Sequence, residues 1–159
     1  MPSPWFPKSC VTPLRGGPVL RWGIVAPGVI ADYFATTVLA NTDQRIVAVA
    51  SRSAERGAAF AQRHGIERSH ASYDQLFADP EVDIVYVAAP HSEHKALGLA
   101  AIAAGKHVLI EKPLALSAAE AEEITAAARA AGVLAAEAMW TRYLPQFDVL
   151  SQLFDRGDL

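Results

Sequence analysis

Lys112 is the residue of this chain whose type and position most strongly suggest chemistry. It stands between Glu111 and Pro113, at the end of an apolar run, HVLI, that is typical of a buried strand. An ammonium group is costly to bury unless it is paired, so a lysine at the carboxyl end of such a strand suggests a functional role. The alternative is an ordinary surface ion pair between Glu111 and Lys112 where the strand ends.

A turn of small residues, APGVIA, follows the first apolar run and opens a predicted helix. It fits the G-x-G-x-x-G/A fingerprint of dinucleotide-binding folds, with Ala26 in the place of the first glycine. Gly28 is the essential member, because without a Cβ the backbone N–H groups can approach a pyrophosphate at the helix N-terminus. The alternative is a plain strand–turn–helix connection. The predicted cofactor contacts in this turn are Ala26, Pro27, Gly28, Val29 and Ile30.

The end of the second predicted strand indicates which dinucleotide is preferred. An NAD enzyme usually offers an Asp or Glu here to the adenosine ribose, but this sequence has Ser51, Arg52 and Ser53. Arg52 can stack on adenine and pair with a 2′-phosphate, and the two serines can donate hydrogen bonds. We therefore expect NADP as the cofactor, with NAD as the alternative. In the other interpretation, Ser53 caps the next helix and Arg52 is a solvated surface residue.

The loop after the third predicted strand, AAPHSEH, is expected to line the same crevice, because ligands of open α/β sheets lie at the carboxyl ends of the strands. Ala89 and Pro90 are its predicted cofactor contacts. His91 and His94 are candidates to touch the nicotinamide ribose. A histidine near a helix start is more often structural, so this alternative stays open for both.

Short apolar runs that alternate with alanine-rich segments must position these residues. The runs are continuous rather than alternating, which is typical of strands buried on both faces of a parallel sheet. Strand–helix alternation at this spacing predicts right-handed crossovers and an α/β fold with a doubly wound parallel sheet. The predicted strands span 20–26, 45–50, 84–88, 107–111 and 133–137, and the predicted helices span 29–40, 53–64, 73–78, 92–104 and 117–131.

Serines and glycines mark the ends of several predicted helices. Ser53, Ser92 and Ser117 stand where N-caps belong, and Ser117 with Glu120 has the spacing of a capping box. A left-handed glycine closes a helix without Cβ strain. The glycines that fall just past helix ends are Gly65, Gly105 and Gly132.

Composition and charge exclude several classes of protein. The chain has 159 residues, is 52% hydrophobic and carries a formal net charge of −3, so we expect one globular domain and neither nucleic acid nor an anionic membrane as a partner. No apolar run approaches the roughly 20 residues of a membrane span, and the proline-rich stretch 1–19 reads as a flexible extension, not a signal peptide. The single cysteine, Cys10, excludes an internal disulfide framework, and we expect a cytoplasmic protein without a metal site.

Four motifs together resemble the glucose–fructose oxidoreductase / inositol dehydrogenase family, also called Gfo/Idh/MocA. They are RWGIVAPGVIADYF, AAPHSEH, GKHVLIEKPLALS and EAMWTRYLP, and they span residues 20–159. Within that family, AMWTRY is most similar to the trans-1,2-dihydrobenzene-1,2-diol / D-xylose dehydrogenase branch. The resemblance implies a Rossmann domain over 20–140 and, over 141–159, the start of a crossover into a second α/β domain that is missing from this chain.

The resemblance also implies roles for individual residues. Lys112 would hydrogen-bond the substrate hydroxyl and help relay its proton, which polarises the oxygen and stabilises alkoxide-like charge. Glu111 would lie near the nicotinamide ribose, and the Lys112–Pro113 bond is often cis. Trp140 and Arg142 would line the mouth of a pocket for a sugar or cyclic diol; packing against the second domain is the alternative.

For the whole chain, the resemblance implies an NADP-dependent oxidoreductase that transfers hydride between nicotinamide and a sugar or cyclic diol. This chain would be the cofactor-binding part, inactive alone. A homo-oligomer is one option for the full-length form, whose oligomeric state the sequence leaves open. A non-catalytic dinucleotide sensor or interaction module is the alternative, since some relatives use the fold in that way. A poorly folded gene fragment is a third interpretation.

Overall fold

The computed structural model describes residues 6–11 and 15–159, which fall into two compact units. The larger unit spans residues 15–138 and contains the sheet. The smaller unit joins residues 6–11 to residues 139–159. Among the helices of these described residues, none is both long enough and apolar enough to cross a membrane.

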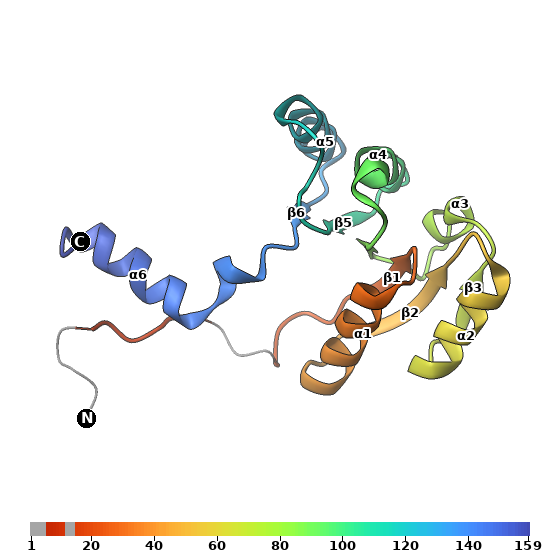
Figure 1. Cartoon of the computed structure of the whole chain (residues 1–159), viewed down its shortest axis with the longest axis horizontal. Helices are drawn as coiled ribbons and strands as arrows, with labels where there is room; N and C mark the ends of the chain where they lie inside the picture. The colour runs from red at the N-terminus through yellow and green to blue at the C-terminus, as the bar shows by residue number, and fades with distance from the viewer. Residues whose placement is uncertain (1–5, 12–14) are drawn as a thin grey trace. The chain divides into compact units, whose positions relative to one another are not determined.

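A six-stranded sheet forms the centre of the larger unit (Figure 1), and all paired strands run parallel. The strands are β1 (Arg21–Val25), β2 (Arg45–Ala50), β3 (Arg68–His70), β4 (Ile84–Val87), β5 (His107–Ile110) and β6 (Ala135–Glu137). Their order is β3-β2-β1-β4-β5-β6, so the direction of winding reverses between β1 and β4. The predicted doubly wound parallel sheet is confirmed, and this reversal is where such sheets bind ligands.

Helices cover both faces of the sheet (Figure 1). On one face lie α1 (Val29–Asn41) and α2 (Ala54–His64); on the other lie α3 (Tyr73–Phe77), α4 (His94–Ala103) and α5 (Ala118–Ala131). Each face has its own apolar cluster, and neighbouring strand residues contribute to opposite clusters, as Ile24 and Val25 do. Because both faces are buried, the strands need continuous apolar runs, which explains the pattern in the sequence.

Most of the expected helix ends are confirmed. The hydroxyls of Ser53 and Ser117 accept hydrogen bonds from backbone N–H groups in the first turns of α2 and α5. Glu120 adds a variant of the capping box, because its carboxylate accepts the N–H of Leu116 rather than that of Ser117. The expected closing glycines all have positive φ angles: Gly65, Gly105 and Gly132.

Two features of the larger unit differ from the expectations. Ser92 is not an N-cap, because it lies within a short 3₁₀ helix, His91–Glu93, that leads directly into α4. Strand β3 was not predicted, because its three residues, Arg68–His70, carry no apolar run. It pairs with β2 alone, at the edge of the sheet, where only one neighbour needs to be matched.

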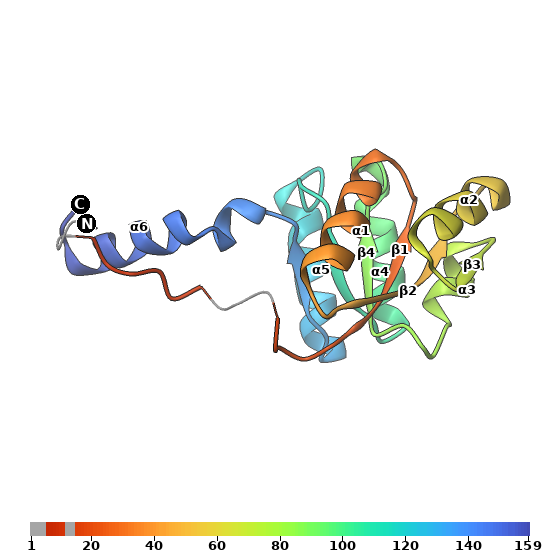
Figure 2. The ribbon, with the colours of Figure 1, turned by 90° about the horizontal axis from the view of Figure 1, so that it is seen from below.

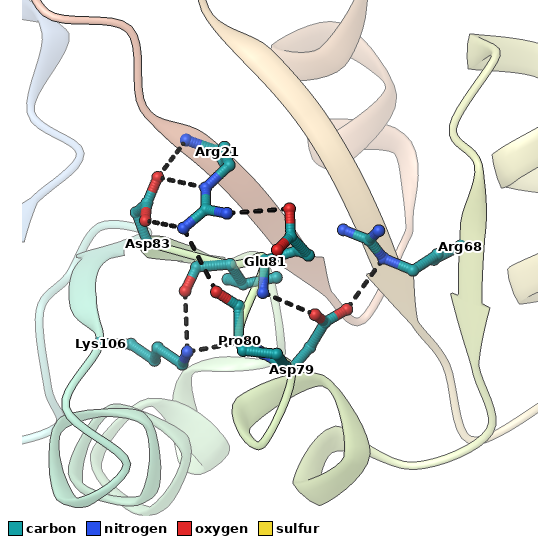
Figure 3. A network of polar contacts seen from close by, with 8 residues as sticks. Arg21, Arg68, Asp79, Pro80, Glu81, Asp83 and Lys106 are labelled. Atoms are coloured by element: carbon teal, nitrogen blue, oxygen red, sulfur yellow. Dashed lines mark hydrogen bonds and ion pairs between the residues drawn. The ribbon is translucent and has the colours of Figure 1, made fainter.

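A polar network holds the amino edge of the sheet together (Figure 3). Arg21, the first residue of β1, donates from its backbone and its guanidinium to Asp83, just before β4, at 2.7–3.0 Å. Its guanidinium also reaches Glu81 at 2.9 Å. Lys106, just before β5, donates to the carbonyl oxygens of Asp79 and Val82 at 2.7 and 2.8 Å. The network therefore joins the amino ends of three neighbouring strands.

The smaller unit contains a 3₁₀ helix, Trp140–Tyr143, and helix α6, Pro145–Arg156. Figure 2 shows residues 6–11 running beside α6. The backbone N–H of Cys10 donates to Asp148 at 2.6 Å, and the amide of Gln152 donates to the carbonyl oxygen of Lys8 at 3.0 Å. Residues of the predicted extension thus form specific contacts with α6.

Candidate dinucleotide-binding site

A hollow of about 330 Å³ lies at the carboxyl edge of the sheet, where the ends of β1, β2 and β4 meet. Its walls come from the turn after β1, the residues after β2 and the loop after β4. The lining residues are Ala26, Pro27, Gly28, Val29, Ile30, Ser51, Arg52, Arg56, Tyr73, Ala88, Ala89 and Pro90. The hollow therefore lies at the reversal of strand order.

Most of the predicted cofactor contacts line this hollow, but some do not. Those outside its lining are Ser53, His91, His94, Glu111 and Lys112. Sequence reasoning missed Arg56, Tyr73 and Ala88. Arg56 could have been found, because it lies one helical turn after Arg52. Tyr73 gives no such signal, since only the fold brings the start of α3 to this edge.

The turn from β1 into α1 presents backbone donors to the hollow. Ala26 has a left-handed backbone, with φ of +59°, and its N–H donates to the carbonyl oxygen of Ala50 at 3.1 Å. Gly28 is the N-cap of α1, and no side chain in the described residues caps this helix. The N–H groups of the first turn of α1 are consequently available to an anion, which the helix dipole also favours.

Gly28 leaves open space that no other described residue fills. A Cβ at this position would have only the carbonyl oxygen of Ala26 near it, at 3.9 Å, which is ordinary contact. At Gly23 and Gly98, by contrast, a Cβ would come within 2.9 Å of Leu76 and 2.7 Å of Ile110. Packing therefore explains the glycines at 23 and 98 but not the one at 28. A pyrophosphate lying against the backbone at Gly28 fits this space.

Two arginines supply positive charge beside this turn. Arg52 follows β2 and Arg56 lies in the first turn of α2, and both are exposed. Neither guanidinium forms an ion pair with a carboxylate among residues 6–11 and 15–159. Both can therefore pair with an anionic ligand such as a phosphate group.

The two serines beside Arg52 have different surroundings. Ser51 is buried, lines the hollow, and accepts the backbone N–H of Ser53 at 3.2 Å. The hydroxyl of Ser53 accepts the backbone N–H of Arg56 at 3.3 Å as the cap of α2. The capping interpretation of Ser53 is thus the one that the geometry supports.

The loop after β4 contains two histidines in contrasting environments. His91 is exposed, whereas His94 is completely buried at the start of α4. The ring nitrogens of His94 lie 3.0 Å from the carbonyl oxygen of Ala89 and 2.8 Å from that of Pro113. His94 thus links the loop after β4 to the segment after β5, which favours the structural interpretation of this residue over direct contact with a cofactor.

Lys112 lies just beyond the carboxyl end of β5, the strand next to β4, and is exposed. Its ammonium forms no hydrogen bond or ion pair with any other described residue, so the expected alternative of a Glu111–Lys112 surface pair is not seen. The Lys112–Pro113 peptide bond is cis, as the resemblance implies. The ammonium is therefore unpaired at the carboxyl edge of the sheet.

The segment around Lys112 is anchored on both sides. The carboxylate of Glu111 accepts the hydroxyl of Tyr86 at 2.6 Å and the backbone N–H of Lys112 at 3.1 Å. Beyond the lysine, the N–H of Leu114 donates to Glu137 at 2.8 Å. The backbone is thus fixed while the lysine side chain stays free.

A second hollow of about 380 Å³ lies between α1 and α2 and shares Pro27, Gly28, Val29 and Arg56 with the first. Asp32 on its wall pairs with Arg63 at 2.6 Å and with His64 at 2.9 Å. Hydrogen bonds from His64 and Arg63 lower the pKa of Asp32, which therefore stays ionised. The negative charge on this wall is neutralised within the chain.

The predicted substrate residues lie in the other unit. Trp140 and Arg142 both belong to the 3₁₀ helix Trp140–Tyr143 and are exposed. Their assignment to a substrate pocket remains a prediction.

A doubly wound parallel sheet with a glycine turn at its first strand–helix junction, and with cationic residues after its second strand, defines a dinucleotide-binding Rossmann domain. The comparison with known families agrees. Residues 20–138 match the model of the Gfo/Idh/MocA oxidoreductase family, described as an NAD-binding Rossmann fold. The chain belongs to this family.

Individual relatives show the same relationship. The chain is 42% identical over 142 residues to trans-1,2-dihydrobenzene-1,2-diol dehydrogenase of Mus musculus, covering 88% of this chain and 43% of that protein. An NAD-binding oxidoreductase from Klebsiella pneumoniae superimposes with a TM-score of 0.80 at 30% identity, over 89% of this chain and 40% of that one. A 3-ketoreductase from Actinomadura kijaniata, in complex with NADP and TDP-benzene, superimposes with a TM-score of 0.80 at 32% identity. The match covers 88% of this chain and 43% of that one. The chain thus spans less than half the length of these relatives.

Proposed function

We propose that this chain is the NADP-binding part of a dehydrogenase that acts on a sugar or cyclic diol. The observation that carries the proposal is the open space at Gly28, next to the uncapped N–H groups of α1 and to Arg52 and Arg56, which form no ion pair with another described residue. A pyrophosphate bound there would accept backbone hydrogen bonds and complement the dipole of α1.

The preference for NADP over NAD rests on the end of β2. NAD-binding domains offer a carboxylate there to the ribose hydroxyls, and a carboxylate would repel a 2′-phosphate. This chain has Arg52 and Arg56 instead, and both line the hollow. Guanidinium groups bind phosphate by charge-assisted hydrogen bonds, so they favour the phosphorylated ribose.

Lys112 is the proposed catalytic residue. A nicotinamide bound here would accept or deliver hydride at C4, and the residues of this chain would handle the proton. In the reducing direction, the ammonium of Lys112 would donate a proton to the substrate carbonyl oxygen as hydride reaches the carbonyl carbon. In the oxidising direction, the neutral amine of Lys112 would accept the proton of the hydroxyl as hydride leaves. The exposed, unpaired position of this ammonium supports the assignment.

The substrate class is proposed from the relatives. The mouse relative is named for a cyclic diol, and the chain covers 43% of its length. We propose that substrate contacts beyond these 159 residues are needed for turnover, and that the chain alone binds the dinucleotide without oxidising a diol.

The test is a calorimetric titration of the chain with NADP and with NAD. We expect NADP to bind more tightly than NAD. Arg52→Ala and Arg56→Ala should each lower the affinity for NADP about tenfold and leave the affinity for NAD nearly unchanged, because each removes a partner of the 2′-phosphate. Arg45→Ala is the matched control, since Arg45 is exposed at the opposite end of β2. Equal affinity for the two dinucleotides, unaffected by either variant, would reject the preference.

A further inference from the structure

Tyr86 is a buried polar residue that the proposed function does not use. It lies in the middle of β4, is 1% exposed, and belongs to the apolar cluster beneath α1 and α2. Its ring stacks on that of Phe34, with centroids 3.9 Å apart and an interplanar angle of 19°. The ring alone would satisfy this packing, so the hydroxyl needs a separate explanation.

The hydroxyl of Tyr86 is used at the carboxyl edge of the sheet. It donates to Oε1 of Glu111 at 2.6 Å, a short bond of the charge-assisted kind. Burial, and then the hydrogen bond to Glu111, raise the pKa of Tyr86, so the phenol keeps its proton and stays a donor. The other oxygen of Glu111 accepts the backbone N–H of Lys112 at 3.1 Å. One carboxylate thus connects the buried core to the residue proposed to be catalytic.

The position of Glu111 in the sheet indicates which half of the dinucleotide it would face. Arg52 after β2 marks the adenosine side of the proposed site and Gly28 after β1 marks the pyrophosphate. A dinucleotide spans the crevice at the strand reversal, so its nicotinamide half lies on the side of β4 and β5. Glu111 and Lys112 follow β5 and therefore lie on that side.

We propose that Tyr86 is a positioning residue for the nicotinamide half of the site: its hydroxyl holds the Glu111 carboxylate, and through it the backbone at Lys112, in the arrangement that receives the cofactor. This proposal rests on the proposed function. A carboxylate half-buried at the end of β5 has many accessible rotamers, and a donor fixed in the core restricts them before a ligand binds.

The variant Tyr86→Phe tests this proposal, because it keeps the stacked ring and removes one hydroxyl. We expect its affinity for NADP to fall about tenfold, while its affinity for adenosine 2′,5′-bisphosphate, which lacks the nicotinamide half, stays unchanged. Equal losses of affinity for both ligands would indicate a general loss of structure and would overturn the proposal. Tyr143→Phe is the matched control, since that hydroxyl belongs to an exposed tyrosine.

A second variant tests the acceptor of this hydrogen bond, the Glu111 carboxylate. Glu111→Gln keeps a side chain of the same shape but removes the charge that strengthens the bond. We expect it to weaken NADP binding, and the losses of the two single variants to be less than additive in the double variant, because both changes act on the same contact. Fully additive losses would show that the two residues act separately.

Amide hydrogen exchange on the free chain gives a readout that needs no cofactor. In Tyr86→Phe, we expect the Lys112 amide to exchange at least about fivefold faster, while buried amides of α5 such as that of Ile124 keep their rates. Failure of the wild-type chain to bind NADP would reject the proposed function, yet exchange would still decide whether Tyr86 holds this segment. An unchanged Lys112 amide would overturn the positioning role.

Discussion

At the scale of single residues, Ala26 and Gly28 show how one turn combines strain with open space. Ala26 takes the left-handed conformation that the first glycine of the dinucleotide fingerprint normally supplies, at a cost of roughly 1–2 kcal/mol for a residue with a Cβ. Gly28 has an extended backbone and room for a Cβ, so its glycine is not needed for folding. The fold carries strain at one position and leaves space for a ligand at the other.

Substitutions at Ala26 should therefore change stability in opposite directions. We expect Ala26→Gly to raise the free energy of unfolding by about 0.5 kcal/mol, since relief of strain exceeds the extra entropy of the unfolded chain. Ala26→Val should lower it by about 2 kcal/mol, because a β-branched residue is poorly tolerated at positive φ. Urea denaturation measures both, and a Val variant as stable as wild type would contradict the strained turn.

The candidate site shows which residues a sequence can reveal. The turn at Gly28 and the strand end at Arg52 follow from local spacing, and both line the hollow. Tyr73 and Tyr86 could not be found in this way, because only the tertiary structure brings Tyr73 to the hollow and Tyr86 to Glu111. The bond from Tyr86 to Glu111 joins residues 25 positions apart on neighbouring strands, and no local pattern encodes it.

At the scale of elements, the sheet uses its two edges differently. The carboxyl edge leaves N–H groups of α1 and the ammonium of Lys112 without a partner among the described residues, whereas a polar network connects Arg21, Asp83 and Lys106 at the amino edge (Figure 3). Arg21 and Asp83 join β1 to β4 at that amino edge, directly below the strand reversal. We infer that the amino edge supplies stability to strands whose other ends are reserved for a ligand.

The stability of this edge should depend on pH in the acid range. The hydrogen bond from Arg21 lowers the pKa of Asp83 below its ordinary value near 4, so the unfolded chain takes up a proton at higher pH than the folded one. The contribution of Asp83 is thus complete at neutral pH and is lost as the pH falls below about 4. The stability advantage of wild type over Asp83→Asn, measured by urea denaturation, should shrink between pH 6 and pH 3.

An advantage of wild type over Asp83→Asn that stays constant across this range would contradict the role of the ion pair. Asp74→Asn serves as a control, because Asp74 lies in the short helix α3 and forms no ion pair with another described residue. It should show a difference from wild type that is small at every pH.

The elements themselves were largely predictable, for physical reasons that also explain the exceptions. Strands buried on both faces need unbroken apolar runs, so β1, β2, β4 and β5 are visible in the sequence. Edge strand β3 consists of Arg68–His70 and buries little apolar surface, so pairing with β2 decides its conformation. Ser92 has the residue type of a cap, but the chain enters α4 through a 3₁₀ turn that needs none.

In the whole molecule, the order of the strands brings the predicted cofactor-binding segments together at one edge of the sheet. The turn after β1, the arginines after β2 and the loop after β4 are far apart in sequence, and the reversal between β1 and β4 gathers them around one hollow. The family match over residues 20–138 covers all of these elements. We propose that this hollow holds the pyrophosphate of a nicotinamide dinucleotide.

Calorimetric titration of NADP into Gly28→Ala, beside wild type, tests that claim most directly. Among the described residues the added methyl group makes only an ordinary contact, with the carbonyl oxygen of Ala26, so the variant should melt like wild type. It should nevertheless bind NADP at least about tenfold more weakly, because the methyl occupies the space of the pyrophosphate. Gly17→Ala, which adds the same group in open surroundings, should match wild type in both measurements. A Gly28→Ala variant that binds NADP with wild-type affinity would contradict the account.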